Sequence, residues 1–183
     1  MLGLPGCVKQ IADGAREMPA VNDDMADMVT RQALRDLVAT MARATDRADP
    51  DLMLSVMHPD AVMASGLDGV GADYARALTE MVRAHLARCF HSIGTQYFEV
   101  DGDRAAGESY VVAYSLAAGE TPQETLTGGR YLDRFERRGG AWKLASRQFV
   151  QDWATSRPAD REPAGLGGGY APDDPSVAFW AQR

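Results

Sequence analysis

The sequence is poor in the residues that metal sites and disulfide frameworks require. Its 183 residues include only two cysteines and three histidines, with no CxxC pair and no cluster of cysteine and histidine. This scarcity excludes a disulfide-stabilised scaffold and a structural zinc site as the basis of the fold. We therefore expect no bound metal, and we expect Cys7 and Cys89 to be reduced thiols of a cytoplasmic protein.

Long apolar runs and an excess of basic residues are also missing. No run approaches the length that spans a membrane, and the first residues lack the charged start and apolar core of a signal peptide. The formal net charge is −7, and the basic residues are dispersed. These features argue against membrane binding and against a nucleic-acid surface. No glycine-rich turn has the pattern of a dinucleotide site, so we expect no cofactor.

The rest of the composition, 45% hydrophobic and 25% charged, is typical of a globular domain. Residues 1–22 carry glycines and prolines without sustained periodicity, and we interpret them as an N-terminal arm. Residues 23–154 are predicted to form one folded domain, and residues 155–183 a C-terminal tail. The tail ends in an apolar run at residues 177–180, which we expect to dock, for example on a neighbouring subunit.

Helical periodicity dominates the first half of this domain, and strand patterns dominate the second. An apolar stripe from Leu34 to Met41 belongs to a helix that ends near Asp46. Long extended runs follow from residue 90 onward, and the hairpin sequence Gly139-Gly140 joins the last two. Helices followed by a meander of long antiparallel strands predict an α+β fold. Twisted strands with helices on one face would form a half-barrel with a pocket between the layers.

His91 lies where the predicted helices give way to strands, so its side chain is expected to face the space between the layers. A histidine there can act as a general base if a carboxylate fixes its tautomer, and Asp46 is the candidate carboxylate. Each residue also has a simpler interpretation. His91 could be a core histidine bonded to a backbone carbonyl, and Asp46 an ordinary helix-terminal aspartate.

Arg147 is predicted in the last strand, in phase with Phe149 and Gln151. If this face lines the pocket, the guanidinium can bind a developing anion; otherwise it is a surface arginine. The methionines are core residues in most proteins, but in a barrel with a cavity their thioethers suit the faces of an aromatic ligand. The candidate substrate-binding residues are Met41, Met57, Met63, Tyr131, Phe149 and Gln151.

Several segments, in this order and spacing, resemble the SnoaL-like branch of the nuclear transport factor 2-like superfamily. They are residues 31–37, Asp46, residues 58–61, His91 with residues 99–103, and residues 128–131 continuing through 136–138 to 142–143. The resemblance implies a cone-shaped half-barrel, in which a curved, mostly antiparallel sheet packs on N-terminal helices around a deep apolar pocket. It also identifies residues 23–154 as the SnoaL-like catalytic domain.

Within the superfamily the chain is most similar to lyases of the hexachlorocyclohexane dehydrochlorinase, scytalone dehydratase and bile-acid 7α-dehydratase type. In the dehydrochlorinase, a helix-end aspartate pairs with a proton-abstracting histidine, and an arginine assists the leaving group. These positions match Asp46, His91 and Arg147. The polar helix residue that these lyases carry upstream of the aspartate is replaced by Met41, which puts halide elimination in particular in doubt.

The resemblance therefore implies a cofactor-independent lyase of aromatic compound catabolism. It would eliminate water, or formaldehyde by a retro-aldol step, from a small hydrophobic, aromatic molecule. One alternative is an isomerase or polyketide cyclase on the same dyad, which product analysis distinguishes. Another is a non-catalytic small-molecule-binding module, which a cavity without a contact between His91 and Asp46 would favour. The resemblance also implies a homo-oligomer, a trimer or alternatively a dimer.

Overall fold

The structure is a computed structural model that describes residues 25–159 and 167–182. The predicted N-terminal arm, residues 1–22, lies outside this range. The elements in chain order are α1 (Met25–Asp46), α2 (Pro50–Ser55), β1 (Met57–Ser65), β2 (Leu67–Val70), α3 (Gly71–His85), β3 (Leu86–Asp101), β4 (Arg104–Ala117), β5 (Gln123–Arg138), β6 (Ala141–Pro158) and α4 (Pro175–Ala181).

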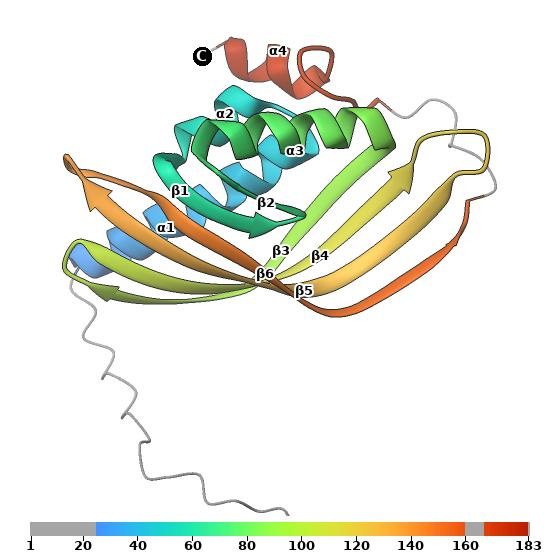
Figure 1. The fold of residues 1–183 in the computed structure, drawn as a ribbon. Helices are drawn as coiled ribbons and strands as arrows, with labels where there is room; N and C mark the ends of the chain where they lie inside the picture. The colour runs from blue at the N-terminus through green and yellow to red at the C-terminus, as the bar shows by residue number, and fades with distance from the viewer. Residues whose placement is uncertain (1–24, 160–166, 183) are drawn as a thin grey trace, which may run out of the picture.

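The six strands form one sheet in the order β2-β1-β6-β5-β4-β3. All neighbours are antiparallel except β1 and β6, which run parallel. In Figure 1 the long strands β3 to β6 curve beneath helices α1 to α3, which cover one face of the sheet. The sheet stays open, so the predicted α+β half-barrel with helices on one side is confirmed.

The end of α1 is a sharp corner built by local chemistry. The helix stops at Asp46, and Ala48 has a positive φ of 47°, a conformation that residues other than glycine seldom adopt. Asp49 then caps α2, its carboxylate accepting a hydrogen bond from the backbone N–H of Leu52 at 3.0 Å, and Pro50 fits the first turn. This corner fixes Asp46 at the edge of the helix layer.

The main core lies between the helices and the covered face of the sheet. Leu34 and Val38 of α1 are fully buried, as are Phe98 and Phe135 of the sheet. The two phenylalanine rings meet edge to face at 6.0 Å between centroids. Burial of each such side chain stabilises the fold by about 1.5–3 kcal/mol. Gly107 makes room for them, because a Cβ there would lie 2.7 Å from the Phe98 ring.

The last strand is longer than predicted. β6 pairs with β5 as far as Pro158, which lies opposite Gln123, so residues 155–158 belong to the sheet and not to the tail. Residues 153–158 are all exposed, and so they lack the alternation by which a strand is recognised in a sequence.

Beyond the strand, residues 167–182 return to the outer side of the helices, where Phe179 and Trp180 of α4 stay exposed. The Arg43 guanidinium of α1 lies 6.0 Å from the ring centroid of Trp180 in α4. Among the described helices, none is both long enough and apolar enough to cross a membrane.

Candidate active site

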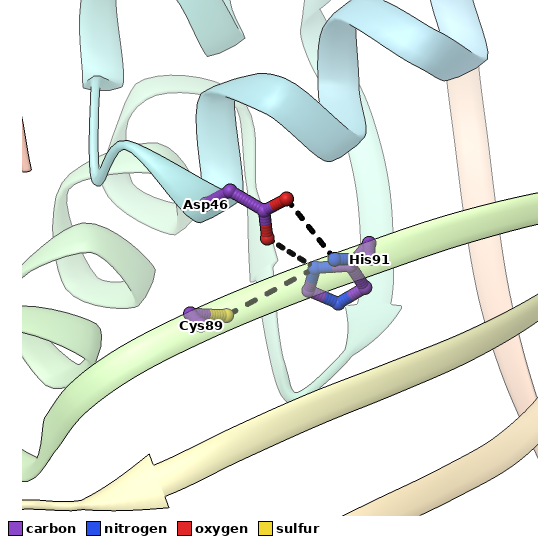
Figure 2. A group of neighbouring side chains, drawn as sticks. All are labelled: Asp46, Cys89 and His91. Carbon is purple, nitrogen blue, oxygen red and sulfur yellow. Dashed lines mark hydrogen bonds and ion pairs between the residues drawn. The ribbon is translucent and has the colours of Figure 1, made fainter. Parts of the chain in front are cut away.

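The carboxylate of Asp46 engages His91 through both of its oxygens. Its Oδ1 lies 2.6 Å from the imidazole Nδ1, and its Oδ2 accepts a hydrogen bond from the backbone N–H of His91 at 3.0 Å (Figure 2). The end of α1 supplies the aspartate and β3 supplies the histidine. The structure thus brings together the two residues that the sequence singled out, although they lie 45 positions apart.

This arrangement assigns the imidazole tautomer. A carboxylate only accepts hydrogen bonds, so Nδ1 carries the proton that it donates to Asp46. In the neutral ring, Nε2 then holds a free lone pair. Strand alternation directs His91 inward, because the neighbouring Phe90 points outward and is 57% exposed. His91 therefore presents a potential proton acceptor, Nε2, on the inner side of the sheet.

A cavity of about 330 Å³ opens beside His91, between the helices and the inner face of the sheet. Its volume is in the range of small-molecule sites. Five predicted residues share its wall with His91: Met41, Tyr131, Arg147, Phe149 and Gln151. Apolar side chains of α3 and β3 complete much of the remaining wall, among them Leu78, Met81, Val82 and Leu86.

Two of the residues predicted to bind substrate lie outside the cavity wall. Met57 and Met63 are each 1% exposed and belong to the main hydrophobic core, and neither is part of the cavity wall. Both lie on β1, which pairs with β6 at one side and β2 at the other. Their side chains pack in the core between this part of the sheet and the helices, so the structure does not place them beside His91 at the cavity.

Arg147 lines the cavity but is already paired. Its Nε and Nη2 donate to the two carboxylate oxygens of Asp133 at 2.8 and 2.7 Å, and both side chains are almost fully buried. Burial acts to lower the pKa of Arg147, but the Asp133 carboxylate outweighs it and holds the pKa above its ordinary value. Loss of one partner from such a buried pair costs about 3–5 kcal/mol. The guanidinium is therefore a charged group held in a fixed position, with Nη1 outside the pair.

Tyr131 combines a rigid ring with an unengaged hydroxyl. The Arg147 guanidinium lies 4.0 Å from the ring centroid, and the Phe149 ring packs at 5.6 Å. Within the described residues, no group forms a hydrogen bond with the Tyr131 hydroxyl. Burial raises the pKa of this phenol to about 12, so it stays protonated near neutral pH. The Tyr131 hydroxyl is thus a hydrogen-bond donor at the cavity wall that no acceptor among the described residues engages.

Cys89 lies beside the dyad, with its Sγ 3.9 Å from the His91 Nδ1 (Figure 2). Asp46, Cys89 and His91 offer ligand atoms within 4.8 Å of one another, a spacing that could hold a metal ion. A tetrahedral Zn²⁺ would separate its nitrogen and oxygen ligands by about 3.4 Å, whereas Nδ1 and Oδ1 are 2.6 Å apart. Burial and the nearby Asp46 carboxylate raise the thiol pKa to about 12, which disfavours the thiolate that metals require. The geometry is that of a hydrogen-bonded dyad.

Two residues of the site carry no clear pattern in the sequence. Asp133 holds Arg147, and Cys89 packs against the dyad; an alternating strand pattern places Cys89 on the face of His91 but does not reveal its role. The other two histidines lie elsewhere. His58 bonds to the backbone carbonyl of Glu136 at 2.9 Å, and His85 is exposed at the end of α3.

Comparison with known proteins matches residues 26–148 to the SnoaL-like domain family. The chain belongs to this family. The resemblance inferred from the sequence is therefore confirmed, and the match runs from α1 into the first part of β6. The sequence matches none of the curated proteins with which it was compared.

Solved structures share the fold at low sequence identity. A hexachlorocyclohexane dehydrochlorinase (LinA) of type 2 is 22% identical with a TM-score of 0.66, covering 76% of this chain and 97% of that one. A scytalone dehydratase-like protein of Novosphingobium aromaticivorans is 18% identical with a TM-score of 0.64, covering 76% and 96%. A type 3 LinA dehydrochlorinase of Novosphingobium barchaimii is 22% identical with a TM-score of 0.64, covering 79% and 96%.

Proposed function

We propose that this SnoaL-like protein is a cofactor-independent lyase that removes water from a small hydrophobic, aromatic molecule. The observation that carries the proposal is the contact between His91 and Asp46 at the wall of a cavity of small-molecule size. This contact disfavours a purely ligand-binding module, which has no need of an oriented base. The dehydrochlorinase and dehydratase-like proteins that share the fold also support an elimination.

In the proposed reaction, Nε2 of His91 removes a proton from a carbon that an adjacent carbonyl group makes acidic. Asp46 stabilises the imidazolium that forms, because its carboxylate accepts from Nδ1. The electron pair of the broken C–H bond forms a carbon–carbon double bond as the neighbouring C–O bond breaks. A ligand seated against the apolar side chains of α3 and β3 would displace water from the cavity and so strengthen these charge interactions.

The departing hydroxyl needs a proton, and the geometry favours Tyr131 as its source. Its phenol is protonated, has no partner in the described part of the protein and lines the cavity. Transfer of the phenol proton completes a water molecule, and the imidazolium then returns a proton to the phenolate. Arg147 would support this step in two ways: its charge over the ring stabilises the phenolate, and its Nη1 can donate to the leaving oxygen.

Product analysis tests the reaction type. Purified protein is incubated with aryl ketones that carry a β-hydroxyl group, and the masses of the products are measured by mass spectrometry. Loss of one water supports the proposal, whereas loss of formaldehyde from a substrate with a primary hydroxyl indicates the retro-aldol reaction on the same base. A product of unchanged mass but new structure indicates an isomerase or cyclase. No conversion of any substrate, with binding retained, contradicts an enzyme function.

The remaining parts of the proposal concern the oligomeric state of the enzyme, its metabolic role and its cellular location. A trimer is expected from its lyase relatives, and sedimentation that gives a monomer at micromolar concentration contradicts it. A role in the catabolism of aromatic compounds fits a cavity wall that includes the aromatic rings of Phe149 and Tyr131. Cys89 is a free thiol two residues from the base, which suits a reducing, cytoplasmic location.

A further inference from the structure

The corner that follows Asp46 is held from outside by residues 167–182, here termed the C-terminal segment. The backbone N–H of Ala171 donates to the carbonyl oxygen of Arg47 at 2.8 Å. The Arg47 Nε lies 3.1 Å from Oδ1 of Asp174, whose side chain is buried. The residue next to the proposed catalytic aspartate is thus fixed through both its backbone and its side chain.

Arg83 of α3 ties the same corner to the same segment. Its Nη2 donates to the carbonyl oxygens of Ala48 at 2.8 Å and of Ala171 at 2.7 Å. Its guanidinium also lies 5.9 Å from the ring centroid of Tyr170. Ala48 is the residue with φ of 47°, and such a conformation persists only where the surroundings impose it. Arg83 and the C-terminal segment provide those surroundings.

The C-terminal segment also reaches the strand that carries His91. The Tyr170 hydroxyl donates to the carbonyl oxygen of Leu86 at 3.0 Å, at the start of β3. The segment therefore touches both elements of the dyad, the end of α1 and the beginning of β3. In Figure 1, α4 lies on the side of the helices away from the sheet. No residue of the segment lines the cavity, so its contacts bear on the dyad and not on the ligand.

This segment lies outside residues 26–148, the part of the chain that matches the family. It is an addition to the family domain whose contacts concentrate on the corner at residues 47–48. The hydrogen bond between Oδ1 and Nδ1 is 2.6 Å long, and a shift of the helix end by about 1 Å would break it. Misplacement of that size can cost an enzyme about 100-fold in rate.

We propose that the C-terminal segment is a positioning element of the active site. By clamping the corner after α1, it holds Asp46 in the place where its carboxylate orients His91 as a base. Arg83 is the positioning residue that joins the segment to the corner. The expected effect on the reaction rate rests on the proposed function. The geometry of the dyad does not, because it can be measured without turnover.

The test uses the full chain with Arg83→Met, which removes the hydrogen bonds to Ala48 and Ala171 but keeps an unbranched apolar side chain. Arg76→Met is the matched control, since Arg76 lies on the same helix and its ion pair within the described residues is an exposed one with Asp73, at 3.6 Å. The dyad is observed as the downfield proton NMR signal of Nδ1–H in protein with ¹⁵N-labelled histidine. Base activity is followed with 5-nitrobenzisoxazole, from which a base removes a ring proton as the N–O bond breaks to give coloured nitrophenolate.

Arg83→Met should lose or broaden the Nδ1–H signal and lower kcat about 100-fold with KM unchanged. Arg83→Lys should recover part of both, and Arg76→Met should match the natural protein. If the natural protein does not turn over the probe, the proposed function is in question and the NMR signal alone decides the positioning role. An intact signal in a folded Arg83→Met variant overturns the inference. If that variant does not fold, Asp174→Asn, which weakens the clamp at Arg47, is judged by the same signal.

Discussion

Substitution of Asp46 by asparagine is the most discriminating change that the site offers. Two donors converge on this carboxylate, the backbone N–H and the Nδ1–H of His91. An amide has one acceptor oxygen and one NH₂ donor, so it can serve only one of them. The backbone N–H cannot change, and therefore takes the oxygen. The NH₂ group then faces Nδ1, which has to become an acceptor, and the ring proton moves to Nε2.

The predicted loss follows from this reversed tautomer. The cavity would face an N–H instead of a lone pair, so the base is absent although the shape of the site is preserved. In serine proteases, the same change to the aspartate beside the catalytic histidine lowers kcat about 10⁴-fold. A loss of that size raises the activation barrier by about 5.4 kcal/mol. The free energy of unfolding should fall by only about 1 kcal/mol, because most hydrogen bonds are remade with the other tautomer.

The assay measures kcat with 5-nitrobenzisoxazole, and with the natural type of substrate once product analysis has identified it. Asp36→Asn is the control, since Asp36 lies on the same helix, is exposed and accepts a side-chain hydrogen bond from Gln32 at 2.9 Å, away from the cavity. Its kcat should equal that of the natural protein. A folded Asp46→Asn variant that keeps more than about a tenth of the natural kcat would refute the assigned tautomer and the role of Nε2 as base.

Three further predictions concern Tyr131 as the proton donor, the stability of the protein at alkaline pH, and the dependence of activity on metal. Tyr131→Phe should lower kcat by about 10²-fold or more while leaving ligand binding intact, as steady-state kinetics and a binding titration can measure, because the proton donor is lost. The protein should lose stability between about pH 9 and 12, measured by urea unfolding. Burial raises the pKa of Tyr74 and Tyr131 from 10.0 and of Cys89 from 9.0 to about 12, so in this window the unfolded chain binds fewer protons than the folded one. Activity should survive a chelator, and activity lost in chelator and restored by a divalent metal would contradict the metal-independent mechanism and point to Asp46, Cys89 and His91 as candidate ligands.

The parts of the fold governed by local chemistry could be predicted well. The apolar stripe from Leu34 to Met41 predicted a helix that ends near Asp46, and Gly139-Gly140 marked the last hairpin. The pairing of Asp46 with His91 needed more, because no periodicity joins residues 45 positions apart. The pairing could be predicted only from the resemblance to the SnoaL-like lyases. In those lyases the residues at the two matching positions form a pair, and the sequence of one chain alone does not show this.

The partner of Arg147 shows why the site could not be completed from the sequence. Counting outward from the Gly139-Gly140 hairpin places Leu132 opposite Arg147. A register shift between Arg134 and Phe135 moves the partner by one residue, to Asp133. Such a bulge reverses which face each residue joins, and a strand pattern alone does not predict it.

The position of Met57 and Met63 in the core, away from this cavity, could not be predicted for a related reason. A buried methionine in the core and one at a cavity wall are both apolar and regularly spaced in the sequence. Only the packing of β1 between β2 and β6 decides that these two lie away from the cavity. The contacts of the C-terminal segment were hidden in the same way, because Arg83 appears in the sequence as a surface residue of α3.

The central claim, that Nε2 of His91 is the base, is tested most directly by His91→Ala with and without added imidazole. The variant should stay folded and bind ligand, lose most turnover of 5-nitrobenzisoxazole, and regain part of it when imidazole enters the space left beside Asp46. Turnover equal to that of the natural protein in the folded variant would contradict the account.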